Sequence, residues 1–428
     1  MINHVVQIGD TLESIASQYN TTSTRLSKDN NIPPNYTLNI GQAIMIVPPS
    51  QTHIVKEGDT INSISETYGT TVLQIFRNNP QLSDRKNLLV GEELVISYPQ
   101  NRDIDVIGYS TTFISEPILI KTLPFLTYLF ILNYKVNSLG NISDLDDQNI
   151  IRLAHDYCVA PIMFVSAMTE TGRGSYATTH AIITNMDVQN QFIENALIMI
   201  KSKGFAGINL AFYSILPEDL PLYVELVSRI TNRFNQEGFE VFLTLTPQTT
   251  GYKTGIPYDK TYFADFGRAT NKVILITYLW QHGFIPQLSQ TTVSFYKEYL
   301  DFVITQIPAD KIYIGISRIA YDWEIPYVEG ETEGVALTNA SALNLANQLG
   351  STILYDEVTQ TPYFYYVSLG VDHFVWFKDS RSINSLLNLV DYYGLAGVAV
   401  WNIMYYNSQT WLSINAQYDI NTNIECEP

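Results

Sequence analysis

The feature that most constrains the fold is a regular alternation of short apolar segments and amphipathic helices between residues 104 and 420. The segment 204–213 is typical: it alternates apolar and small residues, follows a helical pattern, and precedes Pro217 and two acids that open another helix. Eight strands separated by helices predict an α/β fold, a closed parallel TIM (β/α)8 barrel whose chemistry lies at the carboxyl ends of its strands. The predicted strands are 106–109, 127–133, 161–166, 207–212, 240–246, 272–278, 312–316 and 397–401.

The alternation is interrupted between the seventh and eighth strands. Three short apolar segments there, 353–356, 363–367 and 373–377, predict antiparallel strands of a small α+β insertion at about 321–380. We therefore assign residues 104–428 to one barrel domain that carries this insertion.

The first hundred residues contain the same unit twice. His4 and His53 each open a predicted strand that leads through a Gly-Asp-Thr turn into a helix, then a second helix and a closing strand. Two βααβ modules are expected, at 1–49 and 50–98. In the first copy we expect Asp10 to cap the helix, in a capping box with Glu13.

This repeated unit resembles the LysM module, which implies binding of N-acetylglucosamine polymers, namely peptidoglycan or chitin. Such modules hold the glycan between the first strand–helix loop and the loop after the second helix, and two sites on one chain raise avidity. The turn and cap alone are a second explanation of the Gly-Asp-Thr sequence. The glycan-binding residues implied are Gly9, Asp10, Thr11 and Ile32 in the first copy and Gly58, Asp59, Thr60 and Asn79 in the second.

The charge balance excludes several classes of partner. With 24 basic and 42 acidic residues the net charge is −18, which argues against binding nucleic acid or an anionic membrane surface. No apolar run is long enough for a membrane span, and the N-terminus lacks the pattern of a signal peptide. We expect a protein made in the cytoplasm and not exported by the usual route.

Neither a metal nor a cofactor is expected. The six histidines show no metal-ligand spacing, and no nucleotide-binding glycine motif occurs. Of the two cysteines, Cys158 is expected to be a buried thiol and Cys426 to lie in a mobile end.

Short motifs spread along the barrel identify a family. They include Pro-Glu-Asp at 217–219, Lys-Ile-Tyr-Ile-Gly-Ile at 311–316 and Pro-Tyr-Val-Glu-Gly at 326–330. Together with the paired modules, these motifs are similar to those of spore cortex-lytic N-acetylglucosaminidases and spore-coat proteins that carry a family 18 glycoside hydrolase barrel.

The resemblance implies a set of acids at the end of the fourth strand. A Glu protonates the leaving glycosidic oxygen, and an Asp orients the substrate's N-acetyl group, whose oxygen is the internal nucleophile. Two further acids, on the sixth strand and before Asp379, are replaced by Leu279 and Lys378. The fourth-strand positions are occupied here by Ala206, Asn209, Ala211 and Tyr213.

A phenol, with a reference pKa of about 10, is a poor general acid near neutral pH. Our main hypothesis is therefore a non-catalytic pseudo-glycosidase that binds amino-sugar polymers. It would be laid down from the mother-cell cytoplasm onto the spore, at the coat, the cortex surface or the exosporium. Aromatic rings of the barrel would then bind sugars by stacking, without any carboxylate. The rings concerned are those of Tyr278, Trp280, Trp323 and Trp401.

Two alternatives remain. The first is an active cortex N-acetylglucosaminidase or chitinase-type hydrolase with a relocated acid, for which Glu170, Asp187 and Glu218 are candidates. The second is a structural, self-assembling coat or crystal protein, whose partners would be other coat proteins or further copies of itself.

Overall fold

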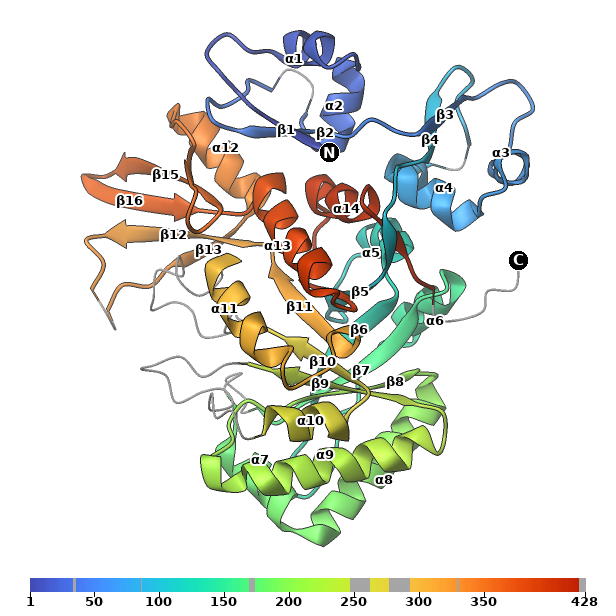
Figure 1. Ribbon diagram of the computed structural model, residues 1–428, viewed down its shortest axis with the longest axis vertical. Helices are drawn as coiled ribbons and strands as arrows, with labels where there is room; N and C mark the ends of the chain where they lie inside the picture. The colour runs from blue at the N-terminus through green and yellow to red at the C-terminus, as the bar shows by residue number, and fades with distance from the viewer. Residues whose placement is uncertain are drawn as a thin grey trace.

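The computed structural model describes residues 1–33, 36–85, 87–168, 174–246, 262–276, 293–328 and 331–422. Two small N-terminal modules lie against a parallel barrel, and an antiparallel sheet projects from one side of that barrel (Figure 1). The predicted fold class is therefore confirmed.

Eight parallel strands form the closed barrel, and each pairs with the next in chain order until the last returns to the first. A short ninth strand, β18 (Tyr418–Ile420), extends the sheet by pairing with the start of β5. The barrel strands are β5 (Arg102–Ser110), β6 (Tyr128–Lys135), β7 (Ala160–Ser166), β8 (Gly207–Ala211), β9 (Glu240–Leu245), β10 (Lys272–Leu275), β11 (Ile312–Ser317) and β17 (Gly397–Trp401).

Helices cover the outside of the barrel, and their apolar faces form one large core with the outward-facing strand residues. Short 3₁₀ turns precede three of the strands or helices, at η2 (Leu123–Phe125), η3 (Pro217–Asp219) and η4 (Ala309–Lys311). The covering helices are α5 (Glu116–Thr122), α6 (Gln148–Asp156), α7 (Tyr176–Thr184), α8 (Met186–Lys203), α9 (Leu220–Asn235), α10 (Phe263–Ala269), α11 (Val293–Val303), α13 (Ser380–Tyr393) and α14 (Ser408–Asn415).

The barrel interior is a second, separate core that is rich in aromatic rings. At its amino-terminal end a charged network closes it: the Lys272 ammonium lies 3.4 Å from Asp105 and 3.3 Å from Glu240. The same ammonium lies 4.4 Å from the centre of the Tyr128 ring. The ammonium group is thus paired with two carboxylates at this end of the barrel, where an unpaired charge would be destabilising. The amino-terminal face of such barrels contributes to stability rather than to catalysis.

The insertion between β11 and β17 contains more strands than the sequence indicated. It is a five-stranded antiparallel sheet in the order β13-β12-β16-β15-β14, with one helix against it. Two strands and the helix were not predicted, because they lie in the segment 319–349, where no clear strand alternation stands out. Its elements are β12 (Ile319–Ile325), β13 (Val335–Thr338), α12 (Asn339–Leu349), β14 (Leu354–Asp356), β15 (Thr361–Ser368) and β16 (Val371–Trp376).

Each N-terminal module is a two-stranded antiparallel sheet packed against two helices. The first contains β1 (Ile2–Val5), α1 (Leu12–Gln18), α2 (Ser23–Asp29) and β2 (Ala43–Ile46). The second contains β3 (Gln51–Ile54), α3 (Ile61–Tyr68), α4 (Val72–Asn78), the 3₁₀ turn η1 (Pro80–Asp84) and β4 (Glu93–Ser97).

The helix cap of the first module differs from the prediction. The cap is Thr11, whose hydroxyl accepts from the Ser14 N–H at 3.1 Å, while the Ser14 hydroxyl accepts from the Thr11 N–H at 2.9 Å. The expected box of Asp10 and Glu13 is therefore wrong by one position. The reason is that the Asp10 carboxylate accepts a hydrogen bond from the Gln7 N–H and so closes the turn that precedes the helix.

Both modules are docked on the barrel and its insertion. In the first module the Ile40 carbonyl accepts from the Ile353 N–H at 2.9 Å, and Gly41 (φ +84°) approaches Ile353 so closely that a Cβ would lie 1.8 Å from its carbonyl oxygen. In the second module the Arg77 guanidinium is buried and donates to the Pro124 carbonyl at 2.6 Å. The modules and the barrel therefore share polar contacts as well as apolar ones.

Two further findings concern expectations from the sequence. Cys158 is disulfide-bonded, so the expectation of a buried free thiol is wrong, and Cys426 lies outside the described residues. None of the helices in the described part of the chain is long and apolar enough to cross a membrane.

Candidate functional site

The carboxyl-terminal mouth of the barrel is lined by buried polar and aromatic side chains. Asn209, on β8, is fully buried, and its carbonyl oxygen accepts from the Thr244 hydroxyl of β9 at 2.9 Å. The Tyr109 ring of β5 and the Trp401 ring of β17 lie 5.2 Å apart between centres. This end of the barrel therefore offers hydrogen-bonding groups and ring faces.

The end of β8 carries no carboxylate. Ala211 is its last residue and is fully buried, with its methyl group in the barrel interior. Tyr213 follows two positions later, is partly buried, and packs against the same interior cluster. Ala206 lies at the opposite, amino-terminal end of the strand, and Leu279 falls outside the described residues. Protonation of a leaving group at this strand would have to come from the Tyr213 phenol or from elsewhere.

Trp401 is held at the mouth by a buried arginine that the sequence did not single out. Arg318, directly after β11, is fully buried, and its backbone N–H donates to the Trp401 carbonyl at 3.0 Å. Its guanidinium donates to the carbonyls of Asn402 and Tyr405, the latter at 3.0 Å, and lies 4.5 Å from the Tyr405 ring centre. Burial lowers the pKa of Arg318 from its ordinary value. An arginine directly after a fully buried strand was the available sequence signal.

The other residues predicted to stack on sugars do not lie at the barrel mouth in the described part of the chain. Trp323 lies in the insertion, packs with Phe374 and Trp376, and has no exposed surface, so it presents no face to a sugar in this structure. Tyr278 and Trp280 lie outside the described residues. Trp401, which is 9% exposed, remains the predicted ring that the structure places at the mouth.

Of the three relocated acids considered, Glu170 lies outside the described residues. Asp187 is exposed in the first turn of α8, and Glu218 is exposed in η3. Neither side chain belongs to the buried cluster of the barrel interior.

An acid–histidine pair that sequence reasoning missed lies next to Glu218. Asp219 ends η3, its side chain is 5% exposed, and its Oδ2 lies 2.8 Å from Nδ1 of His180 on α7. The Tyr176 hydroxyl lies 3.3 Å from the same nitrogen. A second pair in the insertion joins Asp322 to His373 at 3.0 Å. Neither pair could be predicted from the sequence, because the two partners of each pair are far apart in the chain.

The Gly-Asp-Thr turns of the modules are built alike. The Asp10 carboxylate accepts from the Gln7 N–H at 2.7 Å and lies 3.0 Å from His4 Nε2, and these contacts hold its pKa below the ordinary value. In the second copy the carboxylate of Asp59 contacts His53 at 2.8 Å, and its pKa is likewise lowered. The carboxylates therefore fix the turn, while the neighbouring residues Gly9, Thr11, Gly58 and Thr60 stay exposed.

The other two predicted glycan residues are part of the module cores. Ile32 is 5% exposed and packs with Leu26 and Ile44. Asn79 is 2% exposed, and its side chain binds the backbone of Val95 in both directions, at 2.7 and 2.8 Å. Their side chains are thus unavailable to a ligand, because they fasten the second helix of each module to its sheet.

Within the described ranges, no group of three or more His, Cys, Asp or Glu side chains could hold a metal ion. The expectation that no metal is needed remains a prediction.

Comparisons with known proteins agree with this architecture. Residues 110–405 match the model of the glycosyl hydrolases family 18, and residues 4–47 and 53–97 each match the LysM domain. The chain is 31% identical to the cortical fragment-lytic enzyme of Bacillus anthracis over 95% of this chain and 96% of that protein. It is 29% identical to the Bacillus subtilis cortical fragment-lytic enzyme, over 97% and 98% of the two chains.

Solved structures lead to the same group. The Bacillus cereus spore cortex-lytic enzyme SleL superposes with a TM-score of 0.82 at 28% identity, covering 99% of both chains. A Chromobacterium violaceum chitinase shares the fold, with a TM-score of 0.65 at 20% identity over 73% of this chain and 98% of that one.

These findings contradict the main sequence-based hypothesis. Relatives that match over nearly the whole chain are named as lytic enzymes, not as binding or coat proteins. The expectation of a non-catalytic pseudo-glycosidase was therefore wrong, because the loss of acids at the expected positions does not exclude a proton donor from another part of the chain. The findings favour the first alternative, an active hydrolase whose acid lies elsewhere.

Proposed function

We propose that this chain, which belongs to family 18 of the glycosyl hydrolases and carries two LysM domains, hydrolyses fragments of spore cortex peptidoglycan. The observation that supports this most strongly is the shared architecture: modules, barrel and insertion follow the order of cortical fragment-lytic enzymes from end to end. The protein would accordingly be associated with the spore.

The paired modules would hold the polymer. Their Gly-Asp-Thr turns are exposed and rigidly closed by the aspartates, so backbone groups at 9–11 and 58–60 can contact N-acetylglucosamine without rearranging. Preorganised polar groups bind with less loss of entropy than mobile ones. Trp401 at the barrel mouth would then support a sugar ring by stacking.

The reaction requires a proton donor other than the end of β8, where Ala211 and Tyr213 supply no carboxylate. We place this role on His180. The elements that carry His180 and Asp219 follow β7 and β8, so both belong to the side of the barrel where the strands end. Figure 1 shows α7 on the same side of the barrel as the insertion sheet.

The pair has the arrangement of a positioned acid–base group. The buried Asp219 carboxylate accepts from Nδ1–H, which leaves Nε2 of the partly exposed imidazole for the substrate. Protonated Nε2 would give its proton to the glycosidic oxygen as the C1–O bond breaks and the substrate's acetamide oxygen bonds to C1. Water would then attack C1, return a proton to Nε2 and restore the acetamide.

The test is mass spectrometry of cortex fragments incubated with the purified full chain between pH 5 and 8. New reducing ends at N-acetylglucosamine are expected, and His180→Gln or Asp219→Asn should lower their rate of formation by about 10²–10⁴. His155→Gln is the matched control, because His155 contacts the Gly204 carbonyl before β8, at the other end of the barrel.

The outcomes separate cleanly. Absence of any product from the unmodified chain would refute the proposed hydrolysis. Product formation that is equal in all variants would refute the assignment to His180 and leave the hydrolysis standing.

A further inference from the structure

A cavity of about 410 Å3 lies where the two modules meet the barrel, away from the barrel mouth. Its walls come from α2 of the first module, from α4, η1 and β4 of the second, and from α5 and the segment around α14 of the barrel. This volume is within the range of sites that hold small ligands. Because three parts of the molecule build it, the cavity exists only in the docked arrangement.

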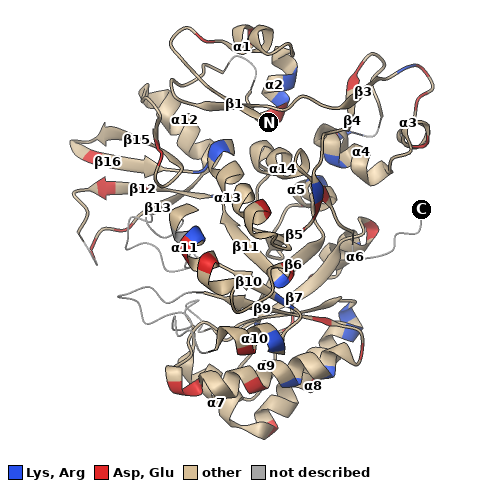
Figure 2. Cartoon of the chain, in the orientation of Figure 1, with Lys and Arg blue, Asp and Glu red and all other residues tan. Residues whose placement is uncertain are grey.

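The charge of the lining differs from that of the whole protein. Four basic and three acidic side chains face the cavity, although the chain carries a net charge of −18. Figure 2 shows basic residues on α2, α4 and α5 around this junction. A lining that carries both signs of charge in an acidic protein favours a ligand with both an anionic and a cationic group.

Two of the basic side chains are committed to the structure. Arg25 donates to Asp29 at 2.9 Å and to the Tyr98 hydroxyl at 2.9 Å, and Arg77 is held by the Pro124 carbonyl. These contacts leave little capacity for a ligand. They stiffen the walls instead, which preserves the shape of the cavity.

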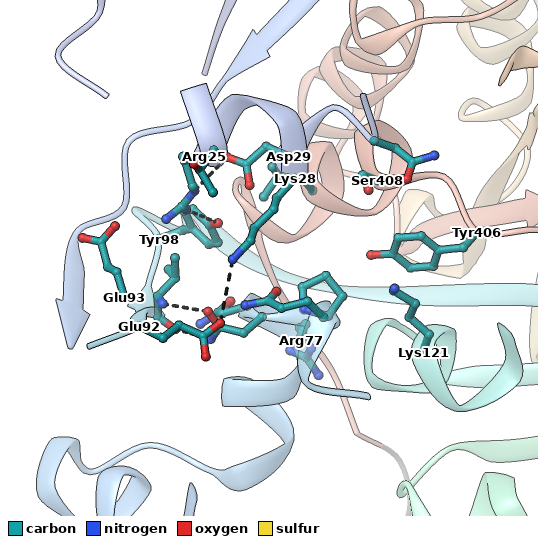
Figure 3. Close-up of a pocket in the computed structure, with 18 of the residues that line it drawn as sticks. Arg25, Lys28, Asp29, Arg77, Glu92, Glu93, Tyr98, Lys121, Tyr406 and Ser408 are labelled. Atoms are coloured by element: carbon teal, nitrogen blue, oxygen red, sulfur yellow. Dashed lines mark hydrogen bonds and ion pairs between the residues drawn. The ribbon is translucent and has the colours of Figure 1, made fainter. Parts of the chain in front are cut away.

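The other two basic side chains remain available. Lys28 is 46% exposed and its nearest acid is Glu92 at 3.8 Å. Lys121 pairs with the exposed Asp84 at 2.7 Å and lies 5.1 Å from the Tyr406 ring centre. In Figure 3, Lys28 extends from one side and Lys121 with Tyr406 from the other toward the same space. An exposed pair such as Lys121 with Asp84 exchanges partners at little cost.

Tyr406 adds a hydroxyl donor at this place. Its hydroxyl makes no hydrogen bond with any residue in the described part of the chain, and burial raises its pKa, so it stays protonated. Lys121 and Tyr406 together can therefore bind a carboxylate through charge-assisted hydrogen bonds. Glu93 lines the cavity as well and can receive an amino group, whereas the carboxylates of Asp29 and Glu92 are held by Arg25 and Arg85.

We propose that this cavity binds a short zwitterionic peptide with a free carboxylate and a free amino group, the chemistry of the peptide stems carried by peptidoglycan. This inference rests on the proposed action on cortex fragments and adds a second recognition element to it. The modules would recognise the sugar chain, and the junction would recognise the peptide attached to it.

The experiment is calorimetric titration of the full chain with the tripeptide L-alanyl-γ-D-glutamyl-meso-diaminopimelate. Saturable binding is expected, and Lys121→Met and Tyr406→Phe should each weaken it about tenfold. Lys201→Met is the control, because Lys201 is a lysine on α8 that also pairs with an acid, Glu237, but lies away from the cavity; this variant should bind as the unmodified chain does. Thermal unfolding of each variant verifies that the modules remain docked.

Two further titrations test the ligand class. The tripeptide acetylated on the diaminopimelate amine, which is the amino group that stays free when the peptide is attached to the sugar chain, should bind more weakly because the ligand then lacks its ammonium group. Inorganic phosphate should bind more weakly still. Equal binding of phosphate, equal binding of the acetylated peptide, or no tripeptide binding at 10 mM would each overturn the proposal. None of these results depends on hydrolysis, so failure here and failure of the proposed enzymatic activity are distinguishable.

Discussion

Replacing Gly41 by alanine tests the docking of the first module, with Gly91 as an internal control. The two glycines hold the same position in the repeat and have nearly the same backbone, with φ of +84° and +85°. At Gly91 an added Cβ would meet nothing within 4 Å, whereas at Gly41 it would lie 1.8 Å from the Ile353 carbonyl oxygen. The left-handed backbone costs alanine about 1–2 kcal/mol at both positions.

The difference between the two substitutions isolates the interface. The clashing atom at Gly41 belongs to the backbone, so the module must move away from the insertion and lose contacts there. These include the Ile353 N–H to Ile40 carbonyl bond at 2.9 Å and the Asn347 amide to Thr37 carbonyl bond at 2.6 Å. At about 1 kcal/mol for each hydrogen bond, Gly41→Ala should cost about 2–3 kcal/mol more than Gly91→Ala.

Scanning calorimetry with limited proteolysis measures this difference. A module of this size shifts its melting temperature by about 4–8 °C per kcal/mol, so Gly41→Ala should produce an early transition more than 10 °C below that of the parent chain. The linkers around the first module should become sensitive to protease at the same temperature. Equal shifts for the two variants would refute the claim that the close approach at Gly41 holds the module in place.

The remaining predictions concern buried lysines and arginine. Lys378 is buried without an ion pair to any described residue, and burial lowers its pKa to about 8. Between pH 8 and 10.5 the unfolded chain therefore binds more protons than the folded chain, so the free energy of unfolding rises with pH in that window. Lys378→Met should raise the free energy of unfolding by about 3 kcal/mol at pH 7, and by progressively less above pH 8. A pH-independent effect of this substitution in urea unfolding would contradict the reasoning. Lys272→Met should destabilise the barrel by about 2–3 kcal/mol, and adding Asp105→Asn should restore part of that loss. Strict additivity of the two changes would contradict the inferred interaction between Lys272 and Asp105. Arg318→Met should cost about 2–4 kcal/mol and change the tryptophan emission of Trp401, whereas an unchanged spectrum would show that the arginine does not position the ring.

The sequence predicted the barrel well because each strand is buried on both faces. Such strands are continuous apolar runs, as in 312–316, and their spacing by helices leaves few other folds. The repeat was equally readable, because the two modules share a turn that needs glycine at Gly9 and Gly58, where φ is +91° and +86°.

The site was predicted less completely, and for physical reasons. The fourth-strand positions Ala211 and Tyr213 were located correctly at the barrel mouth, but a single strand end says nothing about groups supplied by other loops. His180 meets Asp219, and Arg318 meets Tyr405, only after the chain has folded. The side chains of Ile32 and Asn79 are buried, which the sequence could not indicate because it does not show which side of a loop residue faces the core; their contact with glycan stays a prediction.

The docked modules set the geometry in which a long substrate can be held. Gly41 and Arg77 fix the first and second modules to different parts of the barrel domain, so the two modules do not move independently of it. The distance and the angle between the two module turns are therefore fixed. If the turns bind glycan as proposed, a glycan chain long enough to reach both turns would be held at two points in one orientation, whereas a shorter fragment would be held at one point and would dissociate sooner.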